Sequence, residues 1–333
     1  MDTTGSRIGL SLGIIALAAP IVALGLFVGS FAVAVASSEA AHTNPLAGAS
    51  FYTNPDSTAH IAAAAAEAAD PGSADAATIA RIAEQPAAIW LKPEVYPLET
   101  VQSDVTAIAD AALAAGQVPV FVVYGIPNRD CGQYSAGGLS EEDYPVWVEA
   151  IAAALTVHSA VVILEPDALP LAQECGNVDE RVRQVKQGVT TFAGSSATVY
   201  LDAGHSDWLP AATMADLLNR AGVQSVRGFV TNVSNYNDSA AEQLFGESVS
   251  SLTNGAHFIV DTSRNGVGSN GEWCNPSGRA LGTTAEATTD GGLRDANLWI
   301  KEPGESDGTC NNGPKAGEWW NERALELAAA AGW

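Results

Sequence analysis

The sequence has 333 residues, with 38 Asp and Glu against 15 Lys and Arg, which gives a net charge of -23 at pH 7. This balance excludes general binding to nucleic acid or to anionic membrane surfaces, because both carry negative charge that the chain repels. The length is sufficient for one large α/β domain, and the eight Trp residues favour a neutral ligand with flat apolar faces, such as a sugar.

The first predicted element is a membrane-targeting segment at residues 8–36, which is apolar, uncharged and long enough to span a bilayer. Small residues at Ala34 and Ala36 fit cleavage by signal peptidase, so residues 1–36 are predicted to be a signal peptide or, alternatively, an uncleaved membrane anchor. In either case we expect the remainder to be exported, either secreted or held at the cell membrane. Residues 37–50 are small and polar and predict a linker, which places the folded domain at residues 51–333.

Beyond this linker, short apolar or β-branched runs alternate with amphipathic stretches of helical period, the pattern of a parallel α/β fold. The predicted strands are residues 87–91, 118–124, 160–165, 198–202, 226–231, 257–261 and 296–300. The predicted helices include residues 101–115, 141–157, 178–192, 211–221, 240–252 and 318–331. We therefore expect a barrel-like α/β fold with about seven parallel strands.

Polar side chains follow nearly every predicted strand. In chain order they are Lys92; Tyr124, Arg129 and Asp130; Glu165 and Asp167; Asp202 and His205; Asn232 and Asn235; Asp261 and Arg264; and Lys301, Glu305 and Asp307. The C-terminal ends of parallel barrel strands face one end, so these groups are expected to converge on one cleft. Any one pair could be a salt bridge that orients a loop, but carboxylates after five of seven strands predict catalysis.

Asp167 is the strongest candidate among these residues. It follows Pro166, which fixes φ and lacks an N–H, so the third strand ends abruptly and presents the aspartate rigidly, as suits a catalytic acid. A loop-capping turn is the alternative for this tripeptide taken alone. Asp130 is expected nearby, and a second carboxylate raises the pKa of the first, as a general acid requires.

Four cysteines form an even set without the spacing of a zinc ribbon, which favours disulfides in an exported protein. Sequence order suggests Cys131 with Cys175 and Cys274 with Cys310, although four cysteines allow three connectivities. His205 is the only histidine expected near the cleft, and no Gly-rich phosphate loop follows a strand. We therefore expect neither a metal nor another cofactor.

From Phe51 onward the sequence resembles glycoside hydrolase family six, the inverting cellulases. The shared stretches are VYGIPNRDCG (residues 123–132), ILEPDAL (163–169), LDAGHSDW (201–208), TNVSNY (231–236), DTSRNG (261–266), EWCNPSGRALG (272–282) and LWIKEPGESDG (298–308). The resemblance implies a distorted barrel of seven parallel strands, in agreement with the strand count above. It also implies hydrolysis of β-1,4-glucosidic bonds with inversion of configuration.

The resemblance assigns roles residue by residue. It implies that Asp167 is the general acid and that Asp130 keeps it protonated and helps to place the water. Tyr124 would distort the sugar ring, and Asp202 would give electrostatic support. Asp307 occupies the position often proposed as base. Trp90, Trp208 and Trp273 would stack on glucose rings, while His205, Asn235, Lys301 and Glu305 would bond to hydroxyls. Arg129 and Arg264 would be ion-pair partners of the aspartates or, alternatively, contact substrate.

One departure from the family concerns the serine that holds the water. The family usually has Ser directly before the Gly-Gly pair that follows the first cysteine, whereas this chain has Ser135 and then Ala136. We expect a working but slower enzyme.

In the family that the sequence resembles, processive members enclose the substrate with two long loops, one after the fifth strand and one near the C-terminus. Both regions are short here, so the resemblance implies an open cleft and endo-cleavage. Asn237 leads almost directly into the helix that contains Glu242, and only residues 309–317 separate Asp307 from the last helix. We expect the protein to be a monomer whose partner is a β-1,4-glucan polysaccharide and not nucleic acid. The alternatives are a cellobiohydrolase of the same family and a catalytically weak glucan-binding protein, although binding alone would not need the aspartates.

Overall fold

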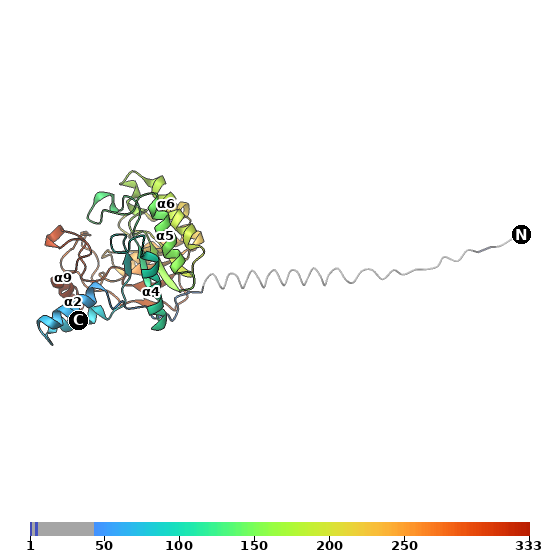
Figure 1. The fold of residues 1–333 in the computed structure, drawn as a ribbon. Helices are drawn as coiled ribbons and strands as arrows, with labels where there is room; N and C mark the ends of the chain where they lie inside the picture. Colours follow the sequence, from blue (N-terminus) through green and yellow to red (C-terminus); the bar gives the residue numbers. More distant parts are fainter. Residues whose placement is uncertain (2–3, 6–42) are drawn as a thin grey trace. The chain divides into compact units, whose positions relative to one another are not determined.

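A computed structural model describes residues 1, 4–5 and 43–333, and residues 44–333 form one unit with seven parallel strands at its centre (Figure 1). These strands are β1 (Ile89–Leu91), β2 (Val120–Val123), β3 (Ala160–Leu164), β4 (Ala197–Asp202), β5 (Gly228–Thr231), β6 (His257–Asp261) and β8 (Arg294–Leu298). Each pairs in parallel with the next in this order. The short β7 (Glu286–Ala287), which the sequence did not predict, pairs antiparallel with β8, and two residues are too few to show a period.

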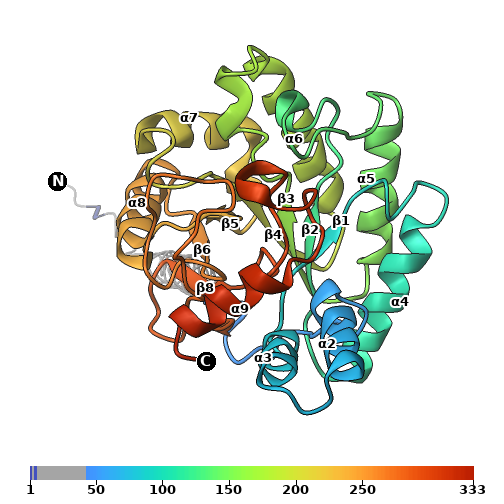
Figure 2. The same cartoon turned by 90° about the vertical axis from the view of Figure 1, so that its left-hand side faces the viewer.

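The two edges of the parallel sheet meet at one bridge. Ala87, before β1, pairs in parallel with Trp299, after β8, and the Ala88 N–H donates to the Trp299 carbonyl over 2.8 Å. The indole N–H of Trp90 donates to the Ile300 carbonyl over 2.9 Å across the same seam. The sheet is therefore a distorted barrel, which confirms the predicted fold class, and Figure 2 shows its strands surrounded by helices.

Eight α-helices cover the barrel within residues 44–333. They are α2 (Thr58–Ala69), α3 (Ala74–Ala83), α4 (Val101–Ala114), α5 (Asp143–Ala154), α6 (Val178–Phe192), α7 (Ala211–Ala221), α8 (Ser239–Leu252) and α9 (Asn321–Ala330). The helices α2 and α3 were not among the predicted elements; they pack with α9 near the seam (Figure 2). The last helix begins at Asn321 rather than at residue 318 because Trp319 forms a β-bridge with Glu305.

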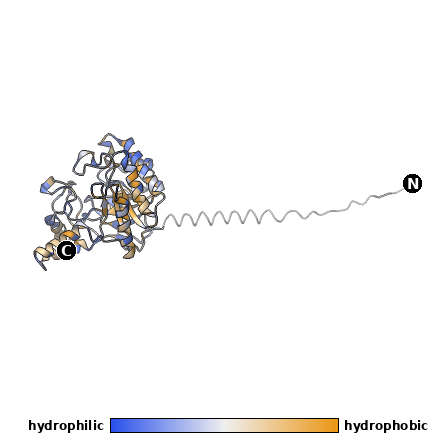
Figure 3. Ribbon diagram, in the orientation of Figure 1, coloured by the Kyte–Doolittle hydropathy of each residue, from blue (hydrophilic) through white to orange (hydrophobic). Residues whose placement is uncertain are grey.

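Apolar side chains fill both faces of the barrel wall. Strand β3 is buried along all five residues, as expected of a parallel strand covered on both sides. Phe121, Leu201 and Phe229 face the helices, whereas Ile163 and Tyr200 fill the barrel interior. Figure 3 shows that hydrophobic residues concentrate in the sheet and its covering helices, while the projecting loops are mostly hydrophilic. This packing fixes the strand ends from which the site is built.

The compact unit begins at Asn44, inside the segment predicted as linker. The Asn44 side-chain amide donates to the carbonyls of Thr288 and Asp295, over 2.9 and 2.7 Å, and Leu46 is buried. Residues 44–50 therefore pack on the folded domain. The predicted targeting segment at residues 8–36 lies outside the described residues, and none of the helices that are described is long and apolar enough to cross a membrane.

Two disulfides connect the loops at the C-terminal ends of the strands. Cys131 is bonded to Cys175, with the Cα atoms 6.0 Å apart, and Cys274 to Cys310, with the Cα atoms 6.2 Å apart. These are the two pairings that sequence order suggested among the three possible. Each bond joins loops that follow different strands.

Candidate active site

A cleft of about 630 Å³ opens where the strands end in the loops. Eleven of the twelve predicted catalytic and substrate-binding residues line it: Trp90, Tyr124, Asp130, Asp167, His205, Trp208, Asn235, Trp273, Lys301, Glu305 and Asp307. The exception is Asp202, which lies behind Asp167 and is 2% exposed. The parallel barrel thus brings together residues from six loops, as the strand-end pattern predicted.

The turn that carries Asp167 has an unusual backbone. Glu165 and Asp167, on either side of Pro166, have φ values of 51° and 68°, in the left-handed region that residues other than glycine seldom adopt. The buried Glu165 carboxylate accepts hydrogen bonds from the N–H groups of Gly125 and Ile126, both at 3.1 Å. Such conformations persist only where surrounding contacts impose them. The rigidity expected from Pro166 therefore also depends on Glu165.

Asp202 fixes this turn from behind. Its Oδ2 accepts the N–H of Asp167 at 3.0 Å and the N–H of Gly204 at 3.1 Å. Within the described part of the chain, its buried Oδ1 has no hydrogen-bond partner. Burial raises the pKa of Asp202 to about 7, although the two backbone donors oppose the shift.

The surroundings of Asp167 favour its acid form. Burial, followed by the charges of Asp202 and Asp130, raises its pKa well above the ordinary value. From the sequence we expected this effect to come from Asp130, but the charge of Asp202 contributes more. A carboxylic acid that stays protonated near neutral pH can act as a general acid.

Asp130 is the first residue of a short 3-10 turn, Asp130–Gly132, which contains Cys131 of the Cys131–Cys175 disulfide. Its Oδ2 accepts the N–H of Ser135 at 2.7 Å, and burial raises its pKa against the effects of this bond and of Arg129. Ser135 and Ala136 both line the cleft, so the displaced serine stays at the site.

Arg129 organises this loop, and within residues 43–333 its ion-pair partner is a glutamate and not an aspartate. Its guanidinium forms an ion pair with Glu94 at 2.9 Å and donates to the carbonyls of Tyr124 at 2.7 Å and Ser135 at 2.8 Å. It also lies over the Tyr124 ring, 4.7 Å from the centroid. These contacts fit the predicted structural role of Arg129 rather than a substrate contact, but its ion-pair partner is Glu94 and not one of the predicted aspartates.

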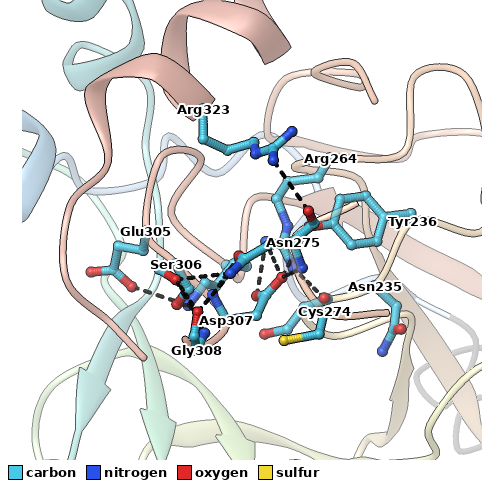
Figure 4. Close-up of polar contacts among 12 residues, drawn as sticks. Asn235, Tyr236, Arg264, Cys274, Asn275, Glu305, Ser306, Asp307, Gly308 and Arg323 are labelled. Atoms are coloured by element: carbon cyan, nitrogen blue, oxygen red, sulfur yellow. Dashed lines mark hydrogen bonds and ion pairs between the residues drawn. The ribbon is translucent and has the colours of Figure 1, made fainter. Parts of the chain in front are cut away.

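Asp307 is the centre of a second network (Figure 4). Arg264 Nη1 contacts its Oδ1 and Oδ2 at 2.9 and 3.1 Å, and the Tyr236 hydroxyl donates to Oδ2 at 3.0 Å. Asn275 donates its N–H to Oδ2 at 3.0 Å and accepts the Asp307 N–H at 2.8 Å. Arg264 is 1% exposed, so it is an ion-pair partner that orients Asp307 rather than a substrate contact.

Aromatic rings flank the carboxylates. Trp90 meets Tyr124 edge to face, with centroids 5.1 Å apart, and Trp208 lies 5.5 Å from the His205 ring. Trp273 is 49% exposed in the cleft and lies 5.9 Å from the Tyr134 ring. Flat apolar faces beside hydrogen-bonding groups suit pyranose rings, which have both apolar faces and hydroxyl edges.

Several residues at the cleft were not predicted from the sequence. Tyr236, Asn275, Glu94, Tyr134 and Glu174 either line the cleft or orient a residue that does. They lie in loops whose conformation no local pattern indicates. Tyr236 and Asn275 do fall inside shared stretches, at residues 231–236 and 272–282, and this is the one signal that could have identified them.

Asp261 has a different place from the one its strand-end position predicted. It does not line the cleft; its carboxylate accepts the N–H groups of Ser263 at 2.9 Å, Ser234 at 3.0 Å and Lys301 at 3.1 Å. It therefore joins the loops after β5, β6 and β8. Among the described residues, no group of three or more His, Cys, Asp or Glu side chains is placed to hold a metal ion.

Comparison with known proteins identifies the family. The sequence profile described as "Glycosyl hydrolases family 6" matches residues 46–331. Endoglucanase A of Cellulomonas fimi is 44% identical over 85% of this chain, which spans 62% of that protein's length. Endoglucanase 1 of Streptomyces halstedii is 42% identical, over 83% of this chain and 88% of that protein.

Among solved structures, that of the endoglucanase Cel6 from Mycobacterium tuberculosis superposes with a TM-score of 0.82 at 45% identity, covering 87% of this chain and all of that one. That structure was determined with a thio-linked cellobioside derivative. The profile match over nearly the whole folded unit, the relatives and the fold agree: the chain belongs to glycosyl hydrolase family 6.

Proposed function

We propose that this protein is an exported endo-β-1,4-glucanase that hydrolyses cellulose with inversion of configuration. The observation that carries the proposal is the pairing of two unlike carboxyl groups in one aromatic-lined cleft. Asp167 is kept protonated by burial and by Asp202, whereas Asp307 is ion-paired with Arg264. A buried carboxyl group that favours its acid form beside a carboxylate held by an arginine fits the division of roles between an acid and a base.

In the proposed reaction, Asp167 gives its proton to the glycosidic oxygen as the bond from that oxygen to the anomeric carbon breaks. A water attacks the same carbon from the opposite face, so the configuration inverts. The proton released by this water passes to Asp307, directly or through a second water. Asp130 helps to place the attacking water, and Tyr124 presses the ring at the cleavage site out of its relaxed chair.

The side chains along the cleft supply binding. Trp90, Trp208 and Trp273 stack on glucose rings, and His205, Asn235, Lys301 and Glu305 bond to hydroxyl groups; all seven line the cleft. Endo-cleavage is supported by the short connections beside it, since α8 begins at Ser239, soon after Asn235. The names of the related endoglucanases support the same mode of action.

The anomeric configuration of the first product tests the mechanism. We expect proton NMR of a β-1,4-glucan digest to show the α-anomer forming first, and Asp167→Asn to lose hydrolysis while it still binds cello-oligosaccharides. Initial formation of the β-anomer would overturn inversion. On soluble substituted cellulose, a rapid fall in viscosity marks endo-cleavage, whereas sugar release with little loss of viscosity would indicate a cellobiohydrolase. Binding of cello-oligosaccharides by the unmodified protein without any hydrolysis would indicate a glucan-binding protein instead of an enzyme.

We further propose that residues 1–36 direct export and that residues following them, up to the packed segment at Asn44, act as a short spacer. Mass spectrometry of the protein made by a secreting host tests this. A mature chain that begins at Ser37 in the medium supports a signal peptide. A full-length chain in the membrane fraction would show an anchor instead.

A further inference from the structure

A buried carboxyl outside the cleft is linked to one that lines it. Glu302 is 7% exposed and does not line the cleft, whereas Glu305 does. Oγ1 of Thr58, the first residue of α2, lies 2.5 Å from Oε2 of Glu302 and 2.9 Å from Oε1 of Glu305. The N–H of Ala59 also donates to Glu302, over 3.3 Å. These contacts join α2 to the loop after β8.

The number of hydrogens in this contact is limited. A threonine hydroxyl has one hydrogen to donate, and it can accept through its lone pairs. If both carboxylates were ionised, neither could donate, and Thr58 could satisfy only one of its two contacts. Both contacts are hydrogen bonds when one carboxyl carries a proton and donates it to Thr58. The arrangement therefore holds one proton more than two ionised glutamates would.

Glu302 is the group that carries this proton. Glu305 lies at the cleft wall and forms an ion pair with Lys301, with Oε2 3.4 Å from the ammonium, whereas no cation pairs with the buried Glu302 among the described residues. Burial, followed by the charge of Glu305, raises the pKa of Glu302 to about 7. The hydroxyl of Ser57, which precedes α2, also hydrogen-bonds to Glu302 and opposes this shift, and His60 Nδ1 lies 3.1 Å from the same hydroxyl. The chain of donors thus runs from Glu302 to Thr58 and from Thr58 to Glu305.

We propose that Glu302 is a positioning residue for glucan binding. It turns the Thr58 hydroxyl toward Glu305, and this hydrogen bond holds the Glu305–Lys301 pair in place at the cleft wall. The inference rests on the proposed function, since it takes a β-1,4-glucan as the ligand. When Glu302 ionises, it competes for the Thr58 hydrogen and repels Glu305. Glucan binding then weakens as the pH rises, independently of proton donation by Asp167.

Binding measured without turnover isolates this effect. In the full chain with Asp167→Asn, calorimetric titration with cellohexaose is carried out at about pH 5.5 and about pH 8.5, on either side of the titration. We expect the Kd to rise about tenfold, the effect of one hydrogen bond to a charged group. Adding Glu302→Gln, whose amide donates to Thr58 at both pH values, is expected to remove this rise.

Variants of Thr58 test the bridge itself. Thr58→Val is expected to weaken binding already at the lower pH and to abolish its pH dependence, while Thr58→Ser keeps both the affinity and the dependence. Glu67→Gln, at an exposed position of the same helix, serves as a control that keeps the parental pH dependence. If Thr58→Val does not fold, the Thr58→Ser and Glu302→Gln variants still test whether the Thr58 bridge causes the pH dependence.

Two results would overturn the inference: a parental Kd that is equal at the two pH values, or the same rise in the Glu302→Gln variant. Both leave the glucanase proposal standing, because binding is still observed. A folded parent that binds no cellohexaose at either pH contradicts the proposed function instead.

Discussion

Asp202 acts on Asp167 in two ways. Its Oδ2 fixes the backbone N–H of Asp167, and its charge is the largest contribution, after burial, that raises the pKa of the Asp167 carboxyl. A residue that does not line the cleft thereby sets the pH range over which the proposed acid stays protonated.

Replacing Asp202 with Asn should lower the pKa of Asp167, because the neighbouring negative charge is removed. The alkaline limb of the pH profile of kcat is then expected to move toward lower pH by about one unit. Measurement of kcat on a soluble cello-oligosaccharide from acid to alkaline pH checks this. An alkaline limb that stays in place would show that burial alone maintains the proton.

The serine displacement beside Asp130 gives a second prediction at single residues. The backbone of Ser135 is fixed by Asp130 and Arg129, and Ala136 lines the cleft without a hydroxyl. Ala136→Ser is expected to raise kcat severalfold by adding a partner for the attacking water. Ser135→Ala is the matched variant. If Ser135 already holds the water, this second change lowers kcat and the first leaves it unchanged.

At the scale of elements, three strand-end carboxylates stabilise loops through backbone N–H groups. Glu165 after β3 binds the start of the loop after β2; Asp202, the last residue of β4, binds the turn of Asp167; Asp261, the last of β6, binds the loops after β5 and β8. Each is buried, so each bond forms in a low local dielectric. The barrel thus uses the carboxylate of one strand end to orient the loop of a neighbour.

The disulfides reinforce the same loops. We expect the double variant Cys131→Ser with Cys175→Ser to lower the free energy of unfolding by about 2–4 kcal/mol, since the bond constrains the unfolded chain. It should also lower kcat, because Asp130 directly precedes Cys131 and loses a tether to the segment after Asp167. Urea denaturation and kcat measure the two effects. An unchanged kcat would show that the hydrogen bond from Ser135 suffices to place Asp130.

At the scale of the whole molecule, buried acids oppose stability at neutral pH. Burial raises the pKa of Glu165 from its usual 4.5 to about 7 and that of Asp202 from 3.8 to about 7. Between the ordinary pKa of each group and its raised value of about 7, the folded state binds more protons than the unfolded state. The free energy of unfolding therefore falls as the pH rises through this window. The net charge of -23 adds self-repulsion in the same direction.

We consequently expect the thermal midpoint to be several degrees higher near pH 5 than near pH 8, as calorimetry at constant ionic strength would show. Glu165→Gln should reduce this difference, because the amide does not titrate. Glu99→Gln, at an exposed position, should leave it unchanged. A midpoint that rises from pH 5 to pH 8 would contradict the assignment of raised pKa values.

The sequence alone determined the architecture and most of the cleft. Seven predicted runs coincide with the seven parallel strands, and α6 and α7 have the predicted bounds, because hydrophobic periodicity is a local property of the chain. The position of polar residues at strand ends placed eight of the predicted residues in one cleft, since parallel strands end on the same side. The other three that line it, Trp90, Trp208 and Trp273, came from the family resemblance. The two disulfides are the pairings that sequence order suggested, although the sequence left three connectivities open.

Only the tertiary structure decided how the site residues are oriented. Whether Arg129 meets an aspartate or Glu94, and whether Asp202 lines the cleft or lies behind it, depends on loop paths that no periodicity encodes. The network of Tyr236 and Asn275 on Asp307 joins residues from three loops, and Thr58 reaches Glu302 across 244 positions. Such contacts depend on how the loops of the closed barrel pack against one another, so local sequence patterns do not predict them.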